Sequence, residues 1–324
     1  MFALTNDITI GKYSFNYIVD VKINTSTDQL TDTAIVTVPN KLQFQGKPIA
    51  VGDNKIFKRE DKVEIKLGYN GRNNVVFTGY VKNIKSGSPV VLECENEMFL
   101  LKKTPITATY ASVTLDELLK EHLPSGLTYK AVNVNLGKFR INGATLAKVL
   151  EEIKKSYGLY CYFRDGKLYA GLHDYDEYRV EHTFKFGKNI IDQGTDLTYK
   201  IKEDIKLKVK CISIYDDNTR LEVDLPSTDA EGELRTLYFY NKTEAELAML
   251  GNIEIEKLKY DGYSGKFEAF GEPFVKKGDA VKILDDKFKE REGLYLVKAV
   301  NYPFGLGGYR QVIEIDKKLS RPQL

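Results

Sequence analysis

The same pattern of alternating apolar residues occurs near both ends of this chain. The run DKVEIKLGYNGRNNVVFTGYVKNI at 61–84 and the run GDAVKILDDKFKEREGLYLVKAVNY at 278–302 each predict two strands joined by a turn. The matching residues are Asp61, Val63, Ile65, Val81, Lys82 and Ile84 in the first run, and Asp279, Val281, Ile283, Val297, Lys298 and Val300 in the second. The segments VVLECE at 90–95 and QVIEID at 311–316 add a third strand to each. A repeated antiparallel barrel is the more economical interpretation, and convergence on a common three-strand meander is the alternative.

The chain is long enough for two or three domains. It has 324 residues, 42% of them hydrophobic, and its aromatic residues suit pleated strands. Strand and turn patterns fill 1–103, with a tight-turn signal at Asn70-Gly71, and strands resume over 179–324 with one helix at TEAELAMLGNIEIEKL. We therefore expect a mainly β fold with two antiparallel barrels in one chain.

Between these two parts, residues 104–178 predict a small α+β insert. Thr114 and Glu117 have the spacing of a capping box before TLDELLKEHL, and Thr145 can cap TLAKVLEEIKKSYG, which Gly158 can end. A hairpin around Asp165-Gly166 follows. The insert thus contains a strand-helix-strand-strand unit.

The composition excludes several classes of protein. A formal net charge of +2 gives no concentrated positive field for binding nucleic acid. Cys94, Cys161 and Cys211 are isolated thiols, which favours buried residues over disulfides or a zinc site. The start lacks the pattern of a cleaved signal, and no run of about 18 apolar residues predicts a membrane span. We expect a soluble protein.

Candidate catalytic groups are few. The three histidines, His122, His173 and His182, have no metal-ligand spacing. GYSGK lacks the second glycine of a nucleophile elbow. GLGGYR has Arg310 where a dinucleotide-binding motif requires its last glycine, so it is more typical of a hairpin tip. The acidic clusters DYDE at 174–177, Asp216-Asp217-Asn218 and Asp285-Asp286 are more typical of turns than of calcium loops. We therefore predict no catalytic residue, no metal, no cofactor and no enzymatic activity.

One strand carries a pattern with a second interpretation. In DIKLKVKCISIY, Lys206, Lys208 and Lys210 alternate with apolar residues, so one face is a row of ammonium groups. An ordinary solvated face is the simple explanation. The lining of a channel is the functional hypothesis.

The order of barrel, insert and barrel resembles the baseplate hub proteins of bacteriophage tails, the late-control D family of contractile injection systems. The phrases that carry the resemblance are DKVEIKLGYNG, FTGYVKNI and VVLECENEMFLLKKTPI, together with the segment TEAELAMLGNIEIEKLKYDGYSGKFEAFGEPFVKKGDAVKI. That segment is similar to the second half of hub proteins and of type VI secretion spike proteins. The insert also resembles a small docking module found in secretins and siderophore receptors.

The resemblance implies a structural protein of a phage or prophage virion, assembled in the host cytoplasm. A homotrimer would present six tube-like barrels, joining the tail tube protein to the central spike protein beside other baseplate proteins, with neither specific nucleic-acid binding nor membrane insertion. The chain ends at LSRPQL without a needle segment, so we expect a separate spike. The alternatives are a tail-associated carbohydrate-binding or cell-wall-degrading module, with its site in the insert or near Asp174 and Asp216, and a β-rich secretion component that forms no ring.

Overall fold

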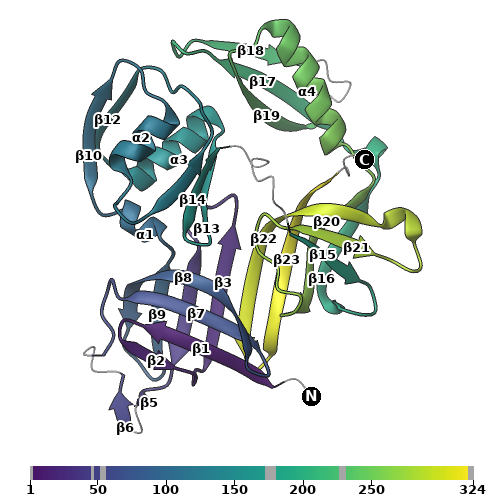
Figure 1. The fold of residues 1–324 in the computed structure, drawn as a ribbon. Helices are drawn as coiled ribbons and strands as arrows, with labels where there is room; N and C mark the ends of the chain where they lie inside the picture. Colours follow the sequence, from purple (N-terminus) through teal and green to yellow (C-terminus); the bar gives the residue numbers. More distant parts are fainter. Residues whose placement is uncertain (1–2, 45–46, 52–55, 172–179, 226–230, 320–324) are drawn as a thin grey trace.

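The computed structural model describes residues 3–44, 47–51, 56–171, 180–225 and 231–319. Most of the described elements are strands, and antiparallel pairing dominates, as the sequence predicts. Figure 1 shows two β-rich parts side by side, with a mixed part above each. None of the helices in these ranges is long and apolar enough to span a bilayer.

The first β unit comprises the strands up to residue 95. They are β1 (Leu4–Ile10), β2 (Tyr13–Phe15), β3 (Asp20–Ser26), β4 (Thr33–Val38), β7 (Lys62–Tyr69), β8 (Arg72–Lys85) and β9 (Val90–Glu95), with the short pair β5 (Lys41–Phe44) and β6 (Lys47–Ala50) beside them. The spatial order is β2-β1-β7-β8-β9-β4-β3. Asn70 and Gly71 turn β7 into β8 with φ of 53° and 82°, which confirms the tight turn.

The second β unit is built from strands near the C-terminus. They are β15 (Glu181–Lys185), β16 (Ile190–Lys200), β20 (Gly262–Phe270), β21 (Ala280–Leu284), β22 (Gly293–Gly305) and β23 (Gly308–Lys318), with the short 3-10 turn η2 (Lys289–Arg291) before β22. Their order is β15-β21-β22-β23-β20-β16. Because β22 also pairs with β3, the two units form one continuous 13-stranded sheet. The buried apolar side chains of both units form one core cluster.

The insert packs its helices against short sheets (Figure 1). Its elements are α1 (Met98–Leu101), β10 (Pro105–Tyr110), α2 (Leu115–His122), β11 (Thr128–Ala131), β12 (Phe139–Thr145), α3 (Leu146–Tyr157), β13 (Tyr160–Arg164) and β14 (Lys167–Gly171). The capping box of Thr114 and Glu117 is present. Thr145 does occupy the N-cap of α3, but its side chain makes no capping hydrogen bond, so this part of the prediction is wrong. Gly158 ends α3 in the left-handed conformation, as expected.

A fourth part lies between β16 and β20. It contains the 3-10 turn η1 (Lys202–Asp204), β17 (Leu207–Ile214), β18 (Arg220–Asp224), β19 (Glu233–Tyr240) and α4 (Glu244–Leu258). The alternating pattern over 179–324 predicts that these strands belong to the second barrel. The structure instead places them in a separate sheet, β18-β17-β19, whose apolar face packs against α4. The domain boundaries at 103/104 and 178/179 stay predictions.

Candidate functional site at the junction of the two β units

The two repeated runs form the same three-stranded meander, β7-β8-β9 and β21-β22-β23. In the first, the N–H of Val81 donates to the carbonyl oxygen of Asp61 at 2.9 Å. In the second, the N–H of Val297 donates to the carbonyl oxygen of Asp279 at 2.8 Å. The residues matched in the sequence therefore make the same ladder bond.

Both meanders also carry a register shift at the same place. The pairing of the second and third strands shifts one residue after Val81, at Lys82, and one residue after Val297, at Lys298. Beyond the shift, β8 pairs with VVLECE and β22 with QVIEID in the register that the sequence alignment gives. A β-bulge is a specific structural device, so its recurrence supports a true internal repeat over convergence.

The turn that enters each meander is repeated as well. The carboxylates of Asp61 and Asp279 each accept a hydrogen bond from the N–H three residues earlier, both at 2.8 Å. The preceding residues, Glu60 and Gly278, both have positive φ, at 76° and 82°. This conformation suits glycine and strains most other residues. The second meander thus holds the residue that the turn favours, and the first holds a strained one.

The β22–β3 ladder joins the units within the chain. It runs antiparallel from Ala299 opposite Ser26 to Phe304 opposite Val21. The hydroxyl of Thr25 donates to the carbonyl oxygen of Val300 at 2.9 Å within this joint.

Large side chains are buried along the same strand. Tyr302 is 2% exposed and Phe304 is 6% exposed, and the hydroxyl of Tyr302 donates to the carbonyl oxygen of Val275 at 2.6 Å. Burial of aromatic area with satisfied polar groups stabilises such a contact. The β22–β3 joint is therefore an apolar interface as well as a ladder.

A buried ion pair crosses this joint. The ammonium of Lys277 lies 2.7 Å from both carboxylate oxygens of Asp32 and 3.1 Å from the carbonyl oxygen of Ser26. The amide of Asn96 donates to the same carboxylate at 3.1 Å. Burial raises the pKa of Asp32 and lowers the pKa of Lys277, which reflects the cost of removing both charges from water. The close contacts offset that cost, so each partner depends on the other.

A second polar cluster ties the insert to the second β unit. Arg164, at the end of β13, donates to the carboxylate of Asp279 at 2.6 Å, and Nε2 of His182 lies 3.1 Å from its other oxygen. Burial acts to raise the pKa of Asp279, but the hydrogen bonds from His182 and Lys276 and the charge of Arg164 hold it below its ordinary value. This carboxylate is therefore an anchor in its ionised form.

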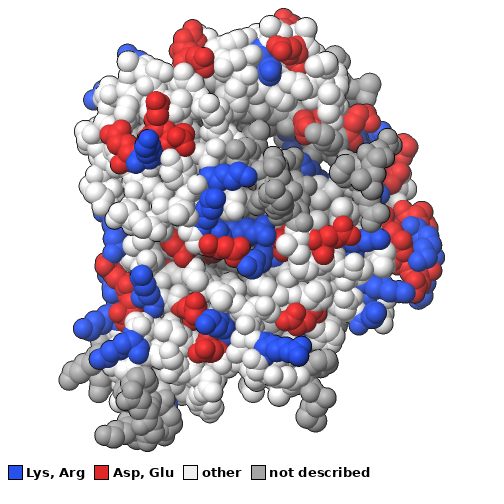
Figure 2. Space-filling model, viewed as in Figure 1, with Lys and Arg blue, Asp and Glu red and all other residues white. Residues whose placement is uncertain are grey.

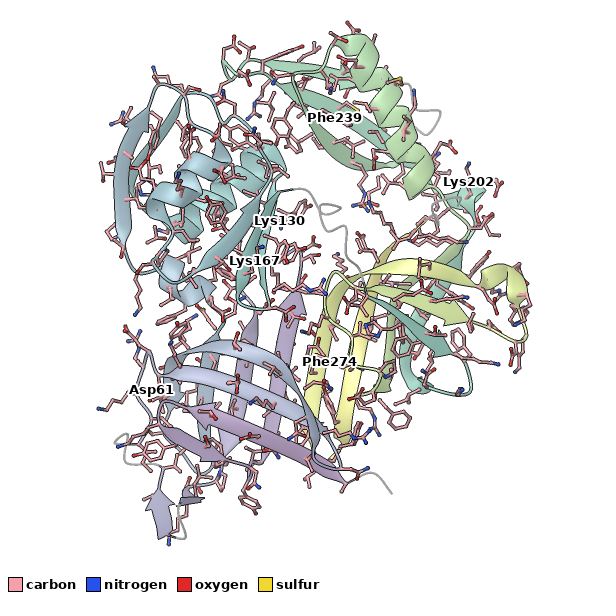
Figure 3. All side chains as sticks on the ribbon, viewed as in Figure 1. Asp61, Lys130, Lys167, Lys202, Phe239 and Phe274 are labelled. Carbon is pink, nitrogen blue, oxygen red and sulfur yellow. The ribbon has the colours of Figure 1, made fainter. Side chains whose placement is uncertain are left out.

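A cavity of about 430 Å³ opens where the two β units and the insert meet. Its lining includes Phe77 of β8, Asp165 of the insert hairpin, and Phe274, which Figure 3 shows beside the junction. The charged side chains around it include those of Asp32 and Lys277, which are already paired with each other.

The predicted lysine row is observed as a pattern. Lys206 and Lys208 are exposed and Lys210 is half-buried, with its ammonium 3.0 Å from a carboxylate oxygen of Glu222. The same face of β17 continues into Ile212, which packs against the core of the insert. Lys208 and Lys210 lie on the separate three-stranded sheet, outside the 13-stranded one, and Lys206 directly precedes β17. Their role as a channel lining stays a prediction.

The remaining candidate residues that the structure describes contact other protein side chains or backbone groups. The hydroxyl of Tyr110 lies 2.7 Å from Nε2 of His122, and His182 contacts Asp279 as described. His173 and the DYDE cluster lie outside the described residues. The carboxylate of Asp217 accepts hydrogen bonds from Thr219 within a turn. The described residues contain no group of three or more His, Cys, Asp or Glu side chains able to hold a metal ion.

The acidic pair near the C-terminus and the thiols also have structural explanations. Asp285 accepts hydrogen bonds from the N–H groups of the loop after β21, and Asp286 pairs with Lys185. All three cysteines are buried. Burial raises the pKa of both Cys94 and Cys161 to about 12, so these thiols are unreactive at neutral pH.

Sequence reasoning missed the two polar clusters. Lys277, Asp32 and Arg164 lie in unrelated segments, and their single charges give no spacing signal. The one available clue was the repeated turn, because Asp279 is the counterpart of Asp61 in the alignment. Burial of Lys277 depends on the β22–β3 joint, which the sequence did not reveal.

Comparison with known proteins places this fold among phage tail proteins. No protein-family model and no curated protein sequence matches the chain. A tail protein of Neisseria meningitidis MC58 is 15% identical, with a TM-score of 0.66, over 98% of this chain and 97% of that one. The 43 kDa tail protein of prophage MuSo2 from Shewanella oneidensis is 14% identical, with a TM-score of 0.62, over 97% and 98%.

A secretion protein shares the fold too. An E. coli component of the type VI secretion system, structurally similar to the T4 phage tail proteins gp27 and gp5, is 9% identical, with a TM-score of 0.58, over 98% of this chain and 77% of that one. The chain therefore has the fold of these phage tail proteins and of this secretion component, and it matches the two tail proteins along nearly their whole length.

Proposed function

We propose that this protein is a structural subunit of a phage tail or of a phage-derived injection particle. In this proposal, three copies form a ring with six β units that joins the sixfold tail tube to a threefold central spike. The observation that carries it is the repeat: two meanders in one chain share the same turn, ladder bond and bulge. A chain with two equivalent units fills two places in a ring, so a trimer presents six.

The buried polar clusters fit a structural role. The pairs Lys277–Asp32 and Arg164–Asp279 hold three parts of the chain in one arrangement. Catalysis requires polar groups that are free to act on a substrate, whereas these groups act on each other. The absence of enzymatic activity stays part of the proposal.

Mass photometry of the purified full chain tests the proposal. We expect a species of three times the 36.9 kDa chain mass whose share rises with protein concentration. Co-expression with the candidate tail-tube and spike proteins should increase that share. A chain that remains monomeric at high concentration and with both partners would contradict the ring.

The carbohydrate-binding or cell-wall-degrading alternative has its own test. The purified chain should neither release dye from labelled peptidoglycan nor bind a glycan array above background. Activity that is lost on substitution of Asp165, which lines the cavity, would favour the alternative.

A further inference from the structure

The two β units share one strand order, which makes their edges comparable. Five strands keep the same order and orientation in both units, β7-β8-β9-β4-β3 in the first and β21-β22-β23-β20-β16 in the second. The next strands differ, because β1 runs antiparallel to β7 whereas β15 runs parallel to β21. On this correspondence β3 matches β16, and β8 matches β22. The strands that join the units inside the chain therefore each have a counterpart elsewhere in the same chain.

The correspondence extends to single residues. Followed across the ladders, the matching positions are Val81, Cys94, Ala34 and Ile23 in the first unit, and Val297, Ile315, Gly265 and Leu197 in the second. β16 carries an irregularity between Ile191 and Asp196 that β3 lacks, and the register matches from Asp196 onward.

We infer that the end of β8 in one copy of this chain pairs with the open edge of β16 in the next copy, and that this joint reproduces the β22–β3 joint. The inference rests on the proposed function, because it names the surfaces through which neighbouring subunits meet. Inside the chain Asn301 stands opposite Asn24. The corresponding residues between copies are Lys85 and Thr198.

Both edges are open within the described residues. β7 pairs with β8 only as far as Tyr80, so from Asn83 onward β8 has a strand partner on one side, β9. β16 is the terminal strand of the sheet and pairs only with β20. An open edge is a template for another strand, and proteins normally cover it or pair it.

Burial along the edges also fits a missing neighbour. Ile23 of β3 is 1% exposed beside β22, whereas its counterpart Leu197 of β16 is half-buried. Val300 of β22 is fully buried, whereas its counterpart Ile84 is half-buried. Ile201, just after β16, is 48% exposed. Pairing with a second copy would bury the same positions that the internal joint buries.

The two joints differ in their chemistry. Where the internal joint has Tyr302 and Phe304, the residues that follow β8 include Ser86 and Ser88, both exposed. A face that meets water before assembly benefits from polar side chains, since exposed apolar edges aggregate. The joint between copies is therefore the weaker one. It is also head-to-tail, so it closes into a ring if the rotation that relates the two units fits.

A disulfide between the two edges tests this inference. The double variant Lys85→Cys/Thr198→Cys should form covalent dimers and trimers on mild oxidation of the full chain, and reduction should return them to monomers. Lys85 and Thr198 correspond to Asn301 and Asn24 of the internal joint. Thr27 and Lys298 form a hydrogen-bonded pair three positions along the same ladder. Because the two kinds of pair alternate along an antiparallel ladder, Asn301 and Asn24 form a non-hydrogen-bonded pair. Such non-hydrogen-bonded pairs bring Cβ atoms close enough for a disulfide. The three native cysteines are buried and should not interfere.

Two control variants test whether cross-linking depends on the proposed pairing. The variant Asn24→Cys/Asn301→Cys should form its disulfide within one chain. The variant Lys85→Cys/Lys148→Cys keeps one edge cysteine and moves the other to the exposed face of α3, and it should stay largely monomeric. Equal cross-linking of this control would show random collision and overturn the inference.

The outcome also separates the inference from the proposed function. If mass photometry shows trimers of the native chain while the Lys85→Cys/Thr198→Cys variant does not cross-link, the edges are wrong and the ring stands. If the native chain stays monomeric and the double variant does not cross-link, both fail.

Discussion

The first and second β units have the same turn at the start of the meander, but the side chains of that turn have different surroundings. The turn into each meander is the same, yet Lys277 of the second unit is buried against Asp32, whereas its counterpart Arg59 is exposed and donates to the carbonyl oxygen of Lys82 at 2.9 Å. Asp279 holds Arg164, whereas Asp61 lies on the side of the first unit remote from the second (Figure 3). The two units therefore share a backbone conformation at this turn, but the surrounding residues determine which side chains contribute to stability.

Charged side chains of both signs are mixed on the surface of the protein. Lys and Arg are interspersed with Asp and Glu over the face in Figure 2, with no large field of one sign. Association through this face would thus depend on local pairing of edges and side chains rather than on long-range attraction. Matched variants in the two units can separate the contribution of the internal joint to stability from that of the repeated backbone.

The largest difference should appear at the buried ion pair. Lys277→Ala leaves the carboxylate of Asp32 buried without its cation, which typically costs about 3–5 kcal/mol. Arg59→Ala, at the corresponding exposed position, should change the free energy of unfolding by about 0.5 kcal/mol or less. Urea unfolding monitored by circular dichroism measures both. Equal losses would show that the two positions are equivalent in energy as well as in backbone.

The strained turn should give opposite effects in the two units. Glu60→Gly removes a side chain from a positive-φ position and should stabilise the protein by up to about 1 kcal/mol. Gly278→Ala introduces that strain, and the new Cβ would lie 3.1 Å from a guanidinium nitrogen of Arg164, so we expect a loss of about 1–2 kcal/mol. Differential scanning calorimetry gives the shifts. Effects of the same sign would mean that the turns are not equivalent.

The pH dependence of stability should depend on Asp279. Its pKa is lowered in the folded state, so its contribution is complete above the ordinary aspartate pKa of about 4 and is lost as pH falls through the folded value. Asp279→Asn should therefore reduce the loss of stability between neutral pH and pH 3 by up to about 1.4 kcal/mol, because pH 3 lies about one unit below the ordinary aspartate pKa.

Urea midpoints at the two pH values measure this effect. The variant Asp61→Asn, which alters the corresponding turn hydrogen bond, gives the cost of that bond at neutral pH. An Asp279→Asn protein with the full acid sensitivity of the native chain would exclude the anchoring role.

The smallest effect on stability is expected at the lysine row. Replacing Lys206, Lys208 and Lys210 by Glu changes exposed or half-buried charges, so the unfolding free energy should change by about 1 kcal/mol or less. If the row lines a channel, particles that carry the triple variant should assemble but deliver their cargo poorly. The matched variant Lys148→Glu/Lys155→Glu changes charge on α3 instead. Unchanged delivery in both would remove the lining hypothesis.

The sequence predicted what short-range patterns encode. Alternation predicted the strands, Asn70-Gly71 and Asp165-Gly166 predicted hairpins, and the capping box of Thr114 and Glu117 predicted the start of α2. The repeat was visible because the turn and bulge leave recognisable residues.

Long-range pairing was not visible. The β22–β3 ladder joins segments about 275 residues apart, and neither segment specifies the other. The separate sheet around β17 was missed for the same reason: its alternating strands look like those of a barrel, and only their pairing with one another sets them apart. The partners of Lys277 and Asp279 follow from those pairings.

Cryo-electron microscopy of the purified chain would show how its copies assemble. We expect threefold rings in which six β units alternate between two environments, with β8 of each copy lying against β16 of the next. Dimers with twofold symmetry, or rings joined through other edges, would contradict it.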